Sequence, residues 1–216
     1  MNININQALF GINMEEGERF THKRIAYIFL ICIIAVAVNF AGSKLAEHIS
    51  FPLYLDSLLT IGVVALCGLV PGVICAFLSN LVLSISTHST LLFSVCHIST
   101  AIIAALVFIY EDSSIINDDK AKRFHGKKPH GYSIESFLWA GLFSAIINGF
   151  LGNAIADLVF SVKPERPSAN VVFQGIYVAF HNLTFANNFG GFVENVVDKM
   201  ISALLSLLFY KVGKVR

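Results

Sequence analysis

Long apolar runs separated by short polar segments make up most of the chain. A helix rises 1.5 Å per residue, so about 20 apolar residues cross the hydrocarbon of a bilayer. Four runs reach roughly this length, at residues 25–46, 91–110, 134–160 and 189–210. The pattern predicts a membrane-spanning helix in each of them.

The apolar stretch 51–87 has a different pattern, because it is too long for one span and is broken in its middle. A Gly-Pro-Gly cluster at 68–72 interrupts it, and glycine and proline disfavour a continuous helix. We expect two short helices joined by a tight turn, at 54–69 and 72–86. Since both are shorter than a usual span, a re-entrant pair that enters the membrane and turns back is an open alternative.

The composition supports an integral membrane protein. Hydrophobic residues make up 56% of the 216 residues and charged residues only 13%, whereas soluble domains carry about 25% charged residues. The basic residues lie in short segments beside apolar runs, which is the arrangement of membrane loops and not of a nucleic-acid surface. We therefore expect an all-α membrane protein that binds no nucleic acid.

Basic residues also predict the orientation, since cytoplasmic loops carry an excess of Lys and Arg. Eleven lie before the first run, in loop 111–133 or at the C-terminus, and three lie in the opposite loops. With the four long runs and the two short helices counted as spans, we expect a single bundle of six transmembrane helices. The basic residues predict that both termini lie in the cytoplasm, and we expect the protein in the plasma membrane.

The same topology divides the chain into segments. Residues 1–23 form a cytoplasmic tail, and residues 24–212 form the transmembrane domain, with 111–133 as a basic cytoplasmic loop. Segment 161–188 contains two prolines and several aromatic and amide side chains. It is too polar for a span and too apolar for a free loop, so we expect it to cap the bundle on the outer side.

Polar side chains within the predicted spans lie toward the outer side of this topology. An ionisable group inside a membrane is costly and usually marks a functional site. We expect a ligand pocket that opens outward and is built from Asp56, Asn80, His97, Asn153, Asp157, Glu194 and Asn195. Asn153 and Asp157 are four residues apart and therefore share one helix face.

Purely structural roles remain open for some of these polar residues. Asp198 and Lys199 are candidates for ion pairs between helices, and Asn80 and Asn148 for interhelical hydrogen bonds. His97 is a candidate for a bond to neighbouring backbone, and Asp56 for a carboxylate at a helix N-terminus, where the helix dipole stabilises it.

The sequence contains none of the common catalytic or cofactor motifs. GxSxG, HExxH, CxxC and a glycine-rich phosphate loop are all absent, and these motifs carry hydrolase, zinc, redox and nucleotide chemistry. The four cysteines lie in apolar runs, where a free cysteine usually packs as a small hydrophobic side chain. We expect no enzyme activity, no metal and no cofactor.

Two segments resemble the substrate-binding (S) components of energy-coupling factor (ECF) transporters. They are the hairpin FPLYLDSLLTIGVVALCGLVPGVICAFLSN and, in the last span, ENVVDKMISALLSLLFYK. The first span also contains the AxxxA pattern of that family, at Ala37 and Ala41, where small residues permit close helix approach.

The resemblance implies a six-helix protein that binds a vitamin or similar nutrient near the outer face. It also implies partners, namely a transmembrane coupling protein and two ATPase subunits, with Ala37 and Ala41 on the docking face. A protein of another class, a ligand sensor or scaffold in the membrane without transport, is the alternative. The sequence does not identify the ligand.

Overall fold

The computed structural model describes residues 22–87, 91–121, 131–160 and 169–214, and these residues form helices without any strand. The long helices are α2 (His22–His48), α4 (Leu69–Thr87), α5 (Ser94–Ala121), α6 (Ile134–Phe160) and α8 (Leu183–Lys214). The short ones are α3 (Thr60–Cys67), α7 (Ala169–Phe180) and the 3₁₀ turn η2 (Leu91–Phe93). The prediction of an all-α fold is confirmed.

Four helical segments are long and apolar enough to cross a membrane. They are His22–His48, Leu69–Thr87, Leu91–Asp112 and Ile134–Val159, which lie in α2, α4, α5 with η2, and α6. Such segments indicate a membrane protein. The first, third and fourth coincide with the long runs predicted as spans, and the second covers the predicted short helix 72–86.

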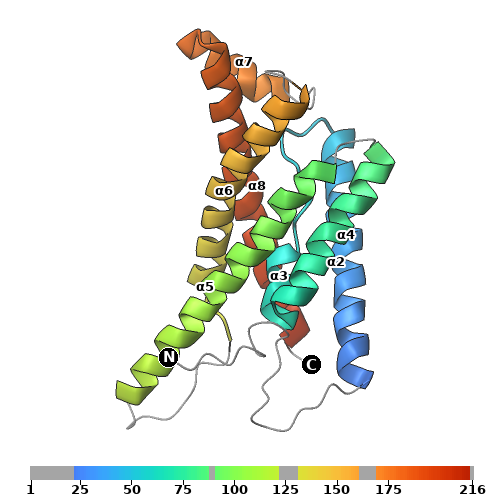
Figure 1. Ribbon diagram of the computed structural model, residues 1–216, viewed down its shortest axis with the longest axis vertical. Coiled ribbons are helices and arrows are strands. Elements are labelled where there is room, and N and C mark those ends of the chain that lie inside the picture. The colour runs from blue at the N-terminus through green and yellow to red at the C-terminus, as the bar shows by residue number, and fades with distance from the viewer. Residues whose placement is uncertain (1–21, 88–90, 122–130, 161–168, 215–216) are drawn as a thin grey trace.

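The helices lie roughly along one axis, as Figure 1 shows. One end of the bundle, which we call the α3 end, holds α3, the first turn of α2 and the last turn of α8. The other, the α7 end, holds α7 together with the end of α6 and the beginning of α8. The most extensive helix contact joins α6 and α8, while α2 lies at the edge and packs mainly on α4 and α3.

Residues 51–59, which we call the connecting segment, form no helix. Figure 1 shows this segment descending from the α7 end toward α3 beside α8. The predicted helix at 54–69 is therefore wrong in its first part, because only Thr60–Cys67 is helical.

Side chains of two helices satisfy the backbone of the connecting segment. The N–H of Leu55 donates to Asp198 Oδ1 at 2.6 Å, and the N–H of Leu59 donates to Asn39 Oδ1 at 2.9 Å. The carbonyl of Leu58 accepts from Ser206 Oγ at 2.9 Å. Irregular backbone is tolerated at membrane depth only where the surrounding protein supplies such partners. Polar residues of α2 and α8 thus make the non-helical path possible.

The predicted turn lies at Gly68. This glycine has a φ of 89°, a conformation that side chains with a Cβ rarely adopt, and it ends α3. Its N–H donates to the carbonyl of Val64 at 2.9 Å. Pro71 lies in the first turn of α4, where a missing N–H costs no intrahelical hydrogen bond. The break is therefore one residue long, shorter than the predicted 68–72 interruption.

Other predicted boundaries also shift. Helix α5 continues to Ala121, so the predicted loop 111–133 begins as helix. The predicted capping segment 161–188 contains α7 and the first turns of α8, which is consistent with its apolar and aromatic composition. The tail 1–21, the loop residues 122–130 and residues 161–168 lie outside the described part of the chain.

Candidate functional site

A polar cavity lies in the half of the bundle nearer α7. The connecting segment, α4, α5, α6 and α8 enclose it, with a volume of about 70 Å³. Its polar lining includes the charged or ionisable residues Asp56, His97 and Lys199, the hydroxyl residues Tyr54 and Thr87, and the amides Asn80, Asn148, Asn153 and Asn195. A space of this size holds a few water molecules or one small polar group.

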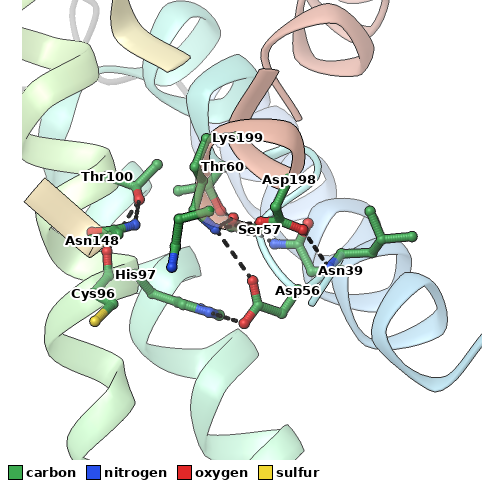
Figure 2. A network of polar contacts seen from close by, with 12 residues as sticks. Asn39, Asp56, Ser57, Thr60, Cys96, His97, Thr100, Asn148, Asp198 and Lys199 are labelled. Atoms are coloured by element: carbon green, nitrogen blue, oxygen red, sulfur yellow. Dashed lines mark hydrogen bonds and ion pairs between the residues drawn. The ribbon is translucent and has the colours of Figure 1, made fainter. Parts of the chain in front are cut away.

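An ionic cluster forms one wall of the cavity (Figure 2). His97 Nε2 lies 2.8 Å from Asp56 Oδ2, and Lys199 Nζ lies 3.5 Å from Asp56 Oδ1. The side chains of His97 and Lys199 are 2% and 3% exposed, whereas that of Asp56 is 16% exposed. Asp56 therefore links two buried nitrogen groups from α5 and α8.

The ammonium group of Lys199 also binds oxygen atoms of two other residues. Its Nζ donates to Asp198 Oδ2 and to Ser57 Oγ, both at 2.7 Å. Asp198 is fully buried, and its second oxygen accepts the N–H of Leu55. A buried ion pair is tolerated when hydrogen bonds satisfy its remaining atoms. The pair therefore fixes the connecting segment against α8 and so sets the position of Asp56.

The opposite wall is held by a small hydrogen-bond network between α5 and α6. Asn148 Nδ2 donates to Thr100 Oγ1 at 2.8 Å, and Ser99 Oγ donates to Asn148 Oδ1 at 2.6 Å. Figure 2 shows Asn148 and Thr100 facing each other. Because the Asn148 side chain has partners at both ends of its amide, its main effect is to fix α5 against α6.

Most of the predicted pocket residues lie on the cavity wall. These are Asp56, Asn80, His97, Asn153 and Asn195. The other two lie elsewhere: Asp157 is exposed and accepts a hydrogen bond from Asn187 Nδ2 at 3.4 Å, and Glu194 is buried outside the lining. Asp157 lies one turn past Asn153, and the last α6 residue in the lining is Ala156.

Sequence reasoning assigned structural roles to two residues that also line the cavity, Lys199 and Asn148. A signal for Lys199 was present, because it lies four residues after Asn195 and so shares its helix face. For Asn148 the structural role is the one that the hydrogen bonds support. Within the described residues no three His, Cys, Asp or Glu side chains gather in a way that would hold a metal ion.

Comparisons of this chain with protein families, with curated proteins and with solved structures find no match.

Proposed function

We propose that this protein is the substrate-capture component of an ECF-type transporter and binds a small vitamin-like nutrient from outside the cell. The observation that carries the proposal is the polar cavity within a largely apolar helical bundle. Polar groups are expensive at membrane depth, and a cavity of this size lined by several of them suits one small polar group of such a nutrient. In this proposal the protein binds and presents the ligand and catalyses no reaction.

The proposed orientation rests on the basic residues. Lys211 and Lys214 lie in the last turn of α8 at the α3 end, and this basic end favours the cytoplasmic side of a plasma-membrane protein. The cavity then lies in the outer half, with α7 above it. Six crossings follow if the connecting segment and α3 together count as one and α8, with 32 residues, counts as the last.

The proposed docking face for the coupling protein is α2. Ala37 and Ala41 are exposed on it, and Ala37 lines an apolar groove of about 630 Å³ between α2 and α4. Small residues in such a groove allow a partner helix to approach closely. The sequence carries no nucleotide-binding motif, so the two ATPase subunits would supply the energy for release.

Co-expression with the coupling protein and the two ATPases tests the transporter proposal. We expect the tagged protein to purify as a complex with all three and to support uptake. Ala37→Leu adds bulk to the groove, so we expect it to leave ligand binding intact and to stop uptake. Ala154→Leu, the same change at an exposed site on α6, is the control and should leave uptake unchanged.

The rival function is a membrane sensor or scaffold that binds a ligand without transport. The same cavity would serve it, so the docking experiment separates the two. Failure to associate with the coupling protein and ATPases, in a preparation that still binds a ligand, would favour the rival. Mass spectrometry of the small molecule that co-purifies with the protein would identify that ligand in either case.

A further inference from the structure

Four asparagines lie on the cavity wall, and the protein itself engages the side chains of three of them. Asn148 has hydrogen-bond partners at both ends of its amide. The Nδ2 groups of Asn153 and Asn195 each donate to a backbone carbonyl oxygen at 2.8 Å. These bonds hold the three amides in place, so the fourth asparagine, Asn80, differs from the others.

The side-chain amide of Asn80 makes no hydrogen bond within the described part of the chain. The residue lies on α4 and is 5% exposed. Its Oδ1 is buried without a partner, and its Nδ2 has none among the described residues. An asparagine that joined two helices would form such a bond, so the structural role that the sequence left open for Asn80 has no support here. Buried polar groups nearly always have a partner, and the cavity is where Asn80 can find one.

The charged side chains of the wall pair with each other. Asp56 Oδ1 lies 3.5 Å from Lys199 Nζ, which also donates to two other side-chain oxygens at 2.7 Å. A charged ligand group would have to compete with this pairing. His97 Nδ1 is a second buried atom of the wall without a hydrogen-bond partner, and it donates or accepts according to the tautomer of the ring. Asn80 therefore decides which ligand group the cavity favours.

A side-chain amide presents N–H donors beside a carbonyl acceptor. A ligand group with an N–H and a carbonyl side by side forms two hydrogen bonds with it, one in each direction. The terminal torsion of asparagine is soft, so the amide of Asn80 can turn to meet such a group. A cavity of about 70 Å³ admits one group of this size.

We propose that the cavity binds a neutral group of the nutrient in which an N–H lies beside a carbonyl, as in a carboxamide, lactam or ureido group, and that the amide of Asn80 holds it. The N–H of the ligand donates to Asn80 Oδ1, and its carbonyl oxygen accepts from Asn80 Nδ2. A ketone lacks the donor and an amidinium lacks the acceptor, so neither makes both bonds. This inference rests on the proposed function, because it names the chemical class of the group by which the nutrient is held.

A series of probes with one shape tests the ligand class. Acetamide, acetone, acetate and acetamidinium have the same arrangement of non-hydrogen atoms and differ in donors, acceptors and charge. We would titrate each into the purified full-length protein in detergent micelles and follow binding by ligand-observed NMR, with protein-free micelles as the blank. We expect acetamide to bind with a dissociation constant at least about fivefold below those of the other probes.

Asn80→Leu tests whether Asn80 holds the group. The change nearly keeps the size of the side chain and removes both its donors and its acceptor, so the affinity for acetamide should fall at least about fivefold. Because the amide has no partner among the described residues, the variant should unfold at the wild-type temperature or above it, whereas loss of a structural hydrogen bond would lower that temperature. Asn187→Leu, the same change at a residue of α8 outside the lining, is the control and should leave acetamide binding unchanged.

The outcomes separate this inference from the proposed function. Tighter binding of acetone, acetate or acetamidinium than of acetamide would overturn the ligand class and leave substrate capture standing. A lower unfolding temperature for Asn80→Leu, or acetamide binding that survives this change, would give Asn80 a structural role and overturn its assignment. Absence of binding by every probe, in wild-type protein that is folded by circular dichroism, would mean that water alone satisfies the amide and would also overturn the inference. None of these results bears on association with the coupling protein and ATPases, which is measured independently.

Discussion

Asn39 connects three segments of the fold with one side chain. Its Nδ2 donates to Thr60 Oγ1 at 3.3 Å and to Ser79 Oγ at 3.0 Å, and its Oδ1 accepts the N–H of Leu59. The residue is fully buried. Both ends of the amide are therefore satisfied, and α2 is fastened to the connecting segment, α3 and α4 at one point.

Replacement of Asn39 by leucine should destabilise the protein. The change keeps the volume but leaves the Leu59 N–H and two hydroxyls without their partner, and an unsatisfied buried polar group costs about 1–3 kcal/mol. We expect a clear fall in the midpoint of thermal unfolding, followed by circular dichroism in detergent. Val38→Leu, at an exposed site on the same helix, is the control, and an equal midpoint for both variants would contradict the assigned role.

The reason for Asn39 could not be found in the sequence, where it lies inside the AxxxA pattern of an apolar run. Its main partner is backbone that the hydrophobic pattern predicted to be helical and hence self-satisfied. By contrast, Asp56 and His97 could be predicted as pocket residues from the sequence, because an ionisable residue at membrane depth usually has a functional role. Their pairing at 2.8 Å could not be predicted, since it depends on the path of the connecting segment.

At the scale of elements, hydropathy predicts which segments lie in the membrane better than it predicts their conformation. Residues 51–67 are apolar enough to suggest a helix, yet only α3 forms within them. Leu55 adopts a positive φ of 48°, and Asp198 and Ser206 of α8 bind the backbone on either side of Ser57. Long-range partners, separated by more than a hundred residues, thus decide the local structure.

The contact between α6 and α8 depends on Gly141. A Cβ at this position would lie 2.8 Å from the Cβ of Ala203 and 2.9 Å from the carbonyl oxygen of Lys199. Gly141→Ala should therefore push the two helices apart and destabilise the protein by about 1–3 kcal/mol. The measurement is the thermal unfolding midpoint in detergent.

Gly175 provides a matched control for that substitution. It lies in α7, and beyond its own helical backbone and chain neighbours no atom of the described residues comes within 4 Å of where a Cβ would lie. Gly175→Ala should leave stability unchanged or raise it slightly, because alanine favours a helix over glycine by up to about 1 kcal/mol. If the two alanine variants unfold at the same temperature, the close approach of α6 and α8 is not a determinant of stability.

For the whole molecule, the all-helical class was predictable because apolar runs of about 20 residues have few other structures open to them in a membrane. The number of membrane crossings is harder to predict from the sequence. Helix α8 is not among the four segments that qualify as spans, since its first half carries Glu194, Asp198 and Lys199 within the bundle. The six membrane crossings therefore remain a prediction. The side of the membrane to which the cavity opens depends on that topology.

Cysteine labelling in intact cells tests that prediction. Gly175 is exposed in α7, and Lys211 is exposed near the end of α8, so they mark opposite ends of the bundle (Figure 1). If the cavity faces outward, a membrane-impermeant maleimide should label Gly175→Cys in intact cells and Lys211→Cys only after permeabilisation. The four native cysteines are buried, so the unsubstituted protein should give little background. Labelling of the Lys211 variant alone in intact cells would indicate the inverse orientation, in which the cavity lies in the cytoplasmic half. That orientation is incompatible with capture of a ligand from outside.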